Sequence, residues 1–390
     1  MKKLVVILLN LCLGLFLADA VVSLLDDSLI LVSGNRAFSV IRGISGLFAM
    51  LMAAVIYGLM GLTPMIPKRQ FLPVTLFSPL AMLAAIPFTI YCYGRIQTLA
   101  WVLSFCQVLL GLGILCWLQG GFKIRWPLVP ERQLGTRRFS WRNLFGFLLV
   151  NVFVLPPAVF VYLAVCASLA VGHFSEGFLA LRPDGMTVQV RKYVRNDGKT
   201  IHLIPMAHVG EAAFYRKISQ SFPTNSIILM EGVTDTRHLL TNGISYKRMA
   251  TSLGLAEQEE EFAPAQGEIV WADVDVEQFS SDTIGFLNMV MLIHAKGVNL
   301  ENVLLVLQYS PPPHVEQQLF DDLLRKRNRH VLEQIRTRLP DSENIMVPWG
   351  VVHMPEIAAE IQKSGFRLVE SREYQVIRFH FARNSKPEGR

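Results

Sequence analysis

The sequence predicts an α-helical membrane region with about five spans, residues 1–171, followed by an α/β soluble domain with a mixed sheet, residues 172–390. Hydrophobic residues make up 52% of the chain and charged residues only 17%, a balance too apolar for an ordinary soluble protein. The apolar residues are concentrated in the first region. All five cysteines lie in that region and all nine histidines lie in the second, so the two regions differ in chemistry as well as in hydropathy.

Apolar runs of spanning length fill the first region. Each is about as long as the roughly 20 residues that a membrane-spanning helix needs, and they cover residues 4–25, 37–62, 71–93, 96–118 and 144–171. Core helices of soluble proteins are seldom this long and apolar in series, so a lipid bilayer is the predicted partner of this region. The first run leaves two alternatives open. Ala18-Asp19-Ala20 resembles the cleavage site of a signal peptide, but the apolar run continues past it as a retained helix would.

Basic charge in the loops predicts the orientation. Lys2 and Lys3 precede the first run, Lys68 and Arg69 separate the second from the third, and six basic residues lie in the loop 120–142. By the positive-inside rule these segments are cytoplasmic, which places the C-terminal domain on the extracytoplasmic side whether or not the first run is cleaved. The loop 120–142 also suits acidic lipid headgroups. Because the net charge of +6 lies largely in these loops, no nucleic-acid partner is expected.

Charges inside spans usually mark ion or proton pathways. The second to fifth runs contain no acidic residue, and Asp26 and Asp27 are assigned to the loop after the first run. The membrane region is therefore predicted to be an anchor or sensor rather than a transporter. The cysteines have neither metal-binding nor disulfide spacing, and we expect them to be small buried hydrophobes.

The second region alternates strand-like and helix-like segments. Asn196-Asp197-Gly198 separates two apolar runs and predicts a β-hairpin. We expect strands at 186–194, 199–206, 226–230, 344–349 and 366–379, with helices at 210–222, 245–255, 277–296, 302–307, 314–339 and 355–364.

Three of the expected strands end near a side chain that can bind a metal. His208 follows the strand 199–206, Glu231 closes the strand 226–230, and His353 follows the strand 344–349. In an α/β sheet the carboxyl ends of parallel strands share one edge, so these side chains are expected to meet. Two imidazoles and a carboxylate suit zinc, manganese or cobalt and leave a position for water. A bound metal lowers the pKa of that water toward about 7, which predicts hydrolytic chemistry.

A hydrolytic site also needs a general base and a group that stabilises the oxyanion. Glu211, in the first turn of the next helix, is a candidate base; Asp273 and Asp275 are others. Asp275 fits equally well as a cap for the helix that starts near residue 277. Arg327 suits an oxyanion-binding role, although a basic helix face in water is an equally good interpretation. A lone histidine at a strand end is usually only hydrogen-bonded, so the metal site depends on the two matching histidine contexts.

Four short motifs in this order resemble the TraB/Tiki superfamily, which includes GumN-like proteins. They are Pro205-Met206-Ala207-His208, Glu231-Gly232, Arg327-Asn328 and Gly350-Val351-Val352-His353. The family pattern begins both histidine motifs with glycine. The first motif departs from it, because Pro205 lacks an N–H and fixes φ. The resemblance covers residues 186–380 and none of the membrane region.

The resemblance implies a metal-dependent hydrolase, a metallopeptidase acting on extracytoplasmic peptide or small-molecule substrates. Tiki members are membrane-anchored metalloproteases that act outside the cytoplasm, in agreement with the predicted topology. Some relatives bind peptide or haem without cleaving it, so a non-catalytic peptide-, haem- or metal-binding signalling module is the alternative. The residues carried over are the metal ligands His208, Glu231 and His353 and the catalytic groups Glu231, Arg327 and Asn328. Glu211 is a further catalytic candidate from its place after His208, and the donor types suit Mn, Co or Zn as the ion.

Overall fold

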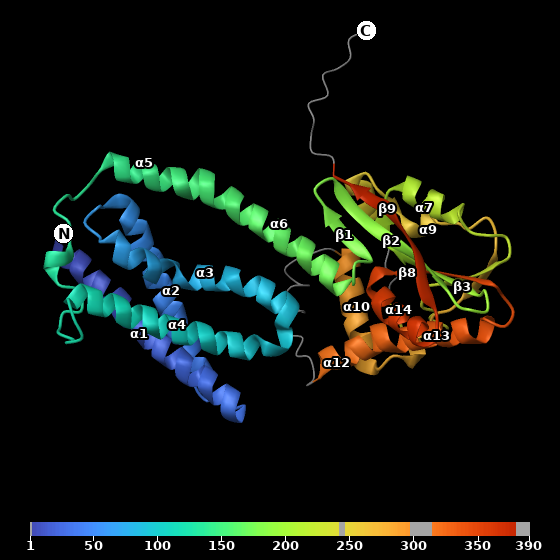
Figure 1. Ribbon diagram of the computed structural model, residues 1–390, viewed down its shortest axis with the longest axis horizontal. Coiled ribbons are helices and arrows are strands. Elements are labelled where there is room, and N and C mark those ends of the chain that lie inside the picture. Colours follow the sequence, from blue (N-terminus) through green and yellow to red (C-terminus); the bar gives the residue numbers. More distant parts are fainter. Residues whose placement is uncertain (1, 242–245, 297–313, 380–390) are drawn as a thin grey trace, which may run out of the picture. The chain divides into compact units, whose positions relative to one another are not determined.

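The structure is a computed structural model that describes residues 2–241, 246–296 and 314–379. The chain divides into two compact units, Met1–Ala170 and Val171–Arg390. Figure 1 shows the first unit as helical and the second as built on a sheet. The predicted succession of an apolar helical region and a mixed α/β domain is therefore confirmed.

The first unit is built from long apolar helices. A 3₁₀ turn at Tyr93–Arg95 separates α3 from α4, and a π-helical turn at Val150–Val154 joins α5 to α6 just before Pro156 and Pro157. The helices are α1 (Lys2–Ser33), α2 (Ser39–Leu62), α3 (Lys68–Cys92), α4 (Ile96–Gln119), α5 (Trp141–Leu149) and α6 (Leu155–Phe174).

Within the described residues, four helical stretches are long and apolar enough to cross a membrane: Lys2–Ser33, Ser39–Leu62, Lys68–Gln119 and Trp141–Phe174. The third has 52 residues. As one straight helix that rises about 1.5 Å per residue, it would be more than twice as long as the roughly 30 Å thickness of a bilayer core. Instead α3 and α4 pack against each other on either side of the 3₁₀ turn (Figure 1). This hairpin contains two of the five predicted runs.

Helix α1 is longer than the predicted run. It continues to Ser33, so Asp26 and Asp27 lie within the helix and not in a loop. Both carboxylates are buried, and Arg42 of α2 forms ion pairs with them. The prediction was wrong here because hydropathy falls at a pair of acids, whereas the helix persists when a neighbouring helix supplies the opposite charge.

The sheet of the second unit combines parallel and antiparallel pairs. Its order is β1-β2-β3-β8-β5-β7, with β9 also paired to β2. β3, β8, β5 and β7 are parallel, whereas β1, β2 and β9 pair antiparallel. β4 (Val209–Gly210) and β6 (Ala256–Glu257) pair separately. The strands are β1 (Leu179–Arg182), β2 (Gly185–Val194), β3 (Thr200–Met206), β5 (Ser226–Met230), β7 (Glu268–Trp271), β8 (Asn344–Gly350) and β9 (Arg367–Arg378).

Helices cover both faces of this sheet, because alternate strand residues point to opposite sides. Ile345 and Val347 of β8 share one core cluster with Ile335 and Ile357 from α13 and α14, whereas Met346 shares the other with residues of α7. A π-helical turn, Asp321–Lys326, joins α12 to α13. The helices are α7 (Ala212–Ser219), α8 (Lys247–Leu253), α9 (Gln258–Glu261), α10 (Ser281–Lys296), α12 (Val315–Phe320), α13 (Arg327–Arg338) and α14 (Met354–Lys363).

Most predicted elements of the second unit are confirmed. The hairpin turn is present between β2 and β3, with Gly198 at a positive φ of 82°. The predicted helix 314–339 is present as α12, the π turn and α13. Strand β1 was not predicted. The predicted helix at 302–307 and the Ser245 cap lie outside the described residues.

Candidate functional site

A cluster of polar side chains lies at the carboxyl edge of β5, β7 and β8, three adjacent strands of the sheet. Glu231 directly follows β5, Asp273 comes two residues after β7, and His353 comes three residues after β8. Arg327 begins α13, whose Val331 and Ile335 are buried in the core cluster against the sheet. The packing of α13 thus brings Arg327 to the strand ends.

Arg327 holds the cluster together. Its Nε lies 3.0 Å from Asp273 Oδ1, and its Nη2 donates to Asp273 Oδ2 and Glu231 Oε1, both at 2.6 Å. Its Nη1 lies 3.3 Å from His353 Nε2. Burial alone would lower the pKa of Arg327, but the hydrogen bonds and negative charges of Asp273 and Glu231 raise it. The guanidinium is therefore the resident cation of the site.

Backbone N–H groups fix the two carboxylates. Asp273 accepts from Gly232 at 3.1 Å and from Val274 at 2.8 Å, and Glu231 accepts from Gly350. A Cβ at position 232 would lie 2.8 Å from the Trp271 ring, and φ there is +157°. A Cβ at position 350 would lie 3.3 Å from Glu231 Oε2. The glycines of two motifs therefore have a steric reason, since side chains would crowd the site.

His353 is 1% exposed and is oriented by a hydrogen-bonded chain. Asn328 Nδ2 donates to Glu356 Oε2 at 2.6 Å, which turns Asn328 Oδ1 toward His353 Nδ1, also at 2.6 Å. Because the amide oxygen only accepts, Nδ1 carries the proton and Nε2 presents a lone pair. Burial lowers the pKa of His353 to about 4, so the ring is neutral at pH 7. Glu231 Oε1 lies 3.6 Å from this Nε2.

Only two of the three predicted metal ligands meet. His208 is exposed, and its ring stacks on Tyr246 with the centroids 4.8 Å apart. In the described part of the chain, no group of three or more His, Cys, Asp and Glu residues is placed to hold a metal ion. The Arg327 nitrogens also lie against the Nε2 and Oε1 atoms that would bind the ion. The residues present therefore do not fit the predicted three-ligand centre in this arrangement.

The other predicted residues divide between the cluster and its surroundings. Glu211 precedes α7 and accepts from the backbone N–H of Arg378 at 3.0 Å, which ties it to β9. Asp275 is a cap: its side chain accepts from Glu277 N at 3.0 Å, and this hydrogen bond, followed by others, lowers its pKa to about 2. Asp273, one of three alternatives in the sequence, is the acid that joins Arg327.

Glu356 is the residue that sequence reasoning missed. It lies three residues after His353, one turn along the helix that begins at Met354. This spacing places a carboxylate near the histidine on one helix face, and it was the available signal.

No family model, curated protein or solved structure matches this chain. The resemblance to the TraB/Tiki superfamily therefore rests on the four motifs. Three of them contribute side chains to the cluster: Glu231, Arg327 with Asn328, and His353.

The arrangement has a defined charge and a defined set of acceptors. Two carboxylates, Glu231 and Asp273, face one guanidinium and one neutral imidazole, so the formal charge is −1. The only lone pair of Nε2 faces Arg327 Nη1 at 3.3 Å, whereas Glu231 Oε1 keeps a lone pair besides the one that accepts from Nη2. This carboxylate oxygen can accept from a water molecule or from a polar ligand.

Proposed function

We propose that the Val171–Arg390 unit is a membrane-tethered hydrolase that acts outside the cytoplasm on peptide or small-molecule substrates. One observation carries the proposal: His353 Nε2 and Glu231 Oε1 lie 3.6 Å apart, each held by its own partners. The four apolar helical stretches support a membrane tether, and the basic loops support the extracytoplasmic placement.

Glu231 supplies the acceptor that activates water. A water that donates one O–H to Oε1, which keeps a lone pair besides the one that accepts from Arg327 Nη2, is oriented beside His353 Nε2, whose single lone pair faces Arg327 Nη1 at 3.3 Å. Glu231 is the proposed general base, because the low pKa of His353 makes the imidazole a weak one. Arg327 and the N–H of Gly350 keep the carboxylate in place, and Asn328 keeps the ring in place.

A divalent ion (Mn, Co or Zn) would supply a metal-bound hydroxide at neutral pH. His353 and Glu231 are suitable donors, but His208 is not placed with them. No step of the proposed reaction is therefore routed through an ion, and the metal requirement is an outcome of the experiment.

A non-catalytic binding module is the second candidate function, and one observation favours it. All three guanidinium nitrogens of Arg327 already contact Asp273, Glu231 or His353. An arginine that is this fully engaged is better suited to hold the site together than to stabilise a developing oxyanion, which needs free donors. A binding module would capture a peptide, haem or metal without turnover.

The experiment is an activity screen of the full chain in detergent, with quenched fluorogenic peptides and esters, with chelator and with added Mn, Co or Zn. We expect turnover that Glu231→Gln and His353→Gln abolish. His208→Gln is the matched control and should retain turnover, because this side chain is exposed and outside the cluster.

Other outcomes separate the alternatives. Saturable ligand binding without turnover contradicts the hydrolase and supports the binding module. Full activity in Glu231→Gln contradicts the assignment of the site. Activity that chelator removes, that metal restores and that His208→Gln abolishes would show a three-ligand centre formed in a different arrangement of the chain.

A further inference from the structure

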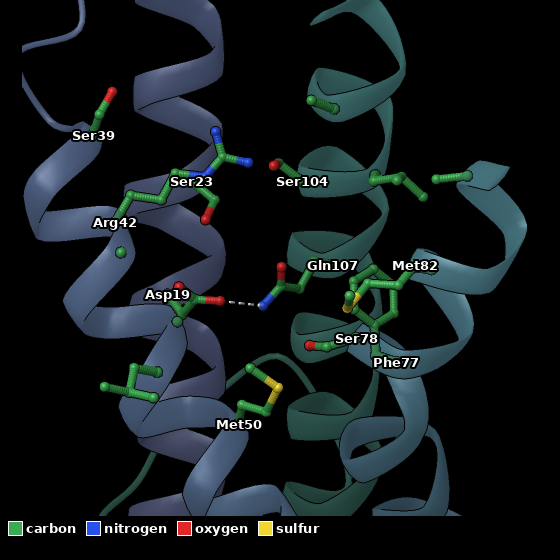
Figure 2. A pocket seen from close by; sticks show the side chains of 17 residues that line it. Asp19, Ser23, Ser39, Arg42, Met50, Phe77, Ser78, Met82, Ser104 and Gln107 are labelled. Atoms are coloured by element: carbon green, nitrogen blue, oxygen red, sulfur yellow. Dashed lines mark hydrogen bonds between the residues drawn. The ribbon is translucent and has the colours of Figure 1, made fainter. Parts of the chain in front are cut away.

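A pocket of about 770 Å³ lies among α1, α2, α3 and α4 (Figure 2). This volume falls within the roughly 300–1,000 Å³ typical of small-molecule sites. Polar side chains of α1, α2 and α4 form part of its wall, and apolar side chains of α3 form another part, including Phe77 and Met82. The polar residues are Asp19, Ser23, Ser39, Arg42, Ser78, Ser104 and Gln107.

Asp19 is the buried acid of this pocket. It is 7% exposed. Ser45 Oγ donates to its Oδ1 at 2.8 Å, and Gln107 Nε2 donates to its Oδ2 at 3.0 Å. Figure 2 shows the Gln107 amide reaching across from α4 to the carboxylate. Both recorded donors are neutral, so the hydrogen bonds fix the carboxylate without balancing its charge.

Asp26 and Asp27 differ from Asp19 because each forms an ion pair with Arg42. Arg42 Nη1 lies 3.4 Å from Asp26 and 2.5 Å from Asp27. Asp27 also accepts from Ser104 at 2.6 Å. Across the described residues, the ion pairs of the first unit are these two of Arg42, and Asp19 takes part in neither.

The charge count leaves a deficit inside a region apolar enough to lie in a membrane. Three buried acids of α1 face one arginine, which gives a formal charge of −2. Asp19 lies seven residues before Asp26, or about 10 Å along the helix axis, so it is two turns away from the Arg42 pairs. Uncompensated charge in the hydrocarbon region is costly, and intramembrane acids usually face a partner or a functional cavity.

We propose that this pocket binds an organic ammonium ion whose charge pairs with Asp19 and whose apolar body lies against the α3 wall. The negative formal charge disfavours anions. A metal ion is a poorer fit, because the described residues contain no group of three or more His, Cys, Asp and Glu placed to hold one. The hydroxyls of Ser23 and Ser104 offer further acceptors, and Phe77 provides an aromatic ring, which attracts cations.

The test uses the full chain in nanodiscs of zwitterionic lipid, with 2-phenylethylammonium as the probe and 2-phenylethanol as its neutral counterpart. Wild type should bind the ammonium ion saturably with one site per chain. Asp19→Asn, which has nearly the same shape, should weaken binding about ten- to a hundredfold, the loss expected for one charge-assisted hydrogen bond. Glu131→Gln, an exposed acid in the loop after α4, should leave binding unchanged.

A second variant guards against misfolding. Asp19→Glu keeps the charge and should bind the ammonium ion more tightly than Asp19→Asn does. The opposite order contradicts the proposal. So do an absence of saturable binding by wild type, equal binding by Asp19→Asn and wild type, and equal affinity for the alcohol and the ammonium ion.

Discussion

Each unit of this protein contains a cluster in which one arginine faces two carboxylates, and the two clusters differ in how completely the charges are satisfied. In the second unit Arg327 pairs with Glu231 and Asp273 and also contacts His353. In the first unit Arg42 pairs with Asp26 and Asp27, and Asp19 receives neutral donors. Arg327 is 13% exposed and Arg42 is 33% exposed. The Arg327 cluster of the second unit holds its acceptors in fixed positions, whereas the Arg42 cluster of the first unit leaves negative charge for a ligand.

Removing the central charge of the soluble cluster should have the largest effect on stability. Arg327→Met leaves Asp273, whose side chain is fully buried, without its cation, and such losses cost about 3–5 kcal/mol. Hydrogen exchange of the full chain should show this loss in peptides from β5, β7 and β8. Arg327→Lys keeps the positive charge but loses the planar guanidinium, so its stability should lie between that of wild type and that of Arg327→Met. A loss below about 1 kcal/mol for Arg327→Met contradicts a buried, essential pair.

Loss of the hydrogen bond between Asn328 and His353 should have the next largest effect, on activity. Asn328→Leu removes the acceptor of the Nδ1 proton, and loss of such orienting partners typically costs about 10- to 100-fold in activity. We expect kcat to fall more than KM rises, because the ring orientation matters for the chemical step. Glu333→Gln, on the exposed side of the same helix, is the control. Unchanged kcat in Asn328→Leu would show that the hydrogen-bonded chain has no part in turnover.

The membrane cluster should respond less to loss of its arginine. Arg42→Met removes a partner that is 33% exposed. Asp26 and Asp27 are buried but keep neutral donors, Ser39 for Asp26 and Ser104 for Asp27, so we expect a cost of roughly 1–2 kcal/mol, between the values for exposed and buried pairs. Thermal unfolding of the full chain in one detergent, with Arg36→Met as the control at an exposed position, measures it. A larger cost than that of Arg327→Met would reverse the proposed difference between the clusters.

Acid should affect the second unit selectively, since every histidine of the chain lies after residue 171. Burial, followed by the charge of Lys192, lowers the pKa of His202 to about 4. A histidine with a lowered folded pKa contributes stability that is fully present above its unfolded pKa of about 6.5 and is lost as pH falls toward about 4. We expect a loss of roughly 1–2 kcal/mol after allowance for partial exposure.

Hydrogen exchange of β3 at pH 7 and pH 5, corrected for intrinsic rates, checks this prediction. His202→Gln should reduce the pH dependence, with His353, whose pKa burial also lowers to about 4, supplying the remainder. His208→Gln, at an exposed position, should not reduce it. An equal slope in His202→Gln and wild type would assign the acid sensitivity to other groups.

Much of the fold was predictable because hydropathy and turn chemistry are local. The apolar runs marked the helices of the first unit, and Asn196-Asp197-Gly198 marked the β2–β3 hairpin. The end of α1 was not predictable in this way. Asp26 and Asp27 stay helical because Arg42, distant in sequence, lies beside them, and this pairing has no local signal.

The candidate site was predicted in part for the same reason. Strand ends that carry Glu231 and His353 meet because their strands are parallel and adjacent. His208 also follows a parallel strand, β3, but its ring stacks on Tyr246, which no spacing indicates. Arg327 was expected either to bind an oxyanion or to belong to a basic helix face in water, yet its position between two acids follows from how α13 packs on the sheet.

The protonation of His353 tests the central claim most directly, because the proposed site depends on an unprotonated Nε2 facing Glu231. Nitrogen-15 NMR of the full chain with labelled histidine, assigned with His353→Gln, reads the tautomer and the charge of this ring. We predict a neutral ring at pH 7 that is protonated at Nδ1 and stays neutral down to about pH 5. A ring that carries its proton on Nε2, or that is charged at pH 7, would contradict the account.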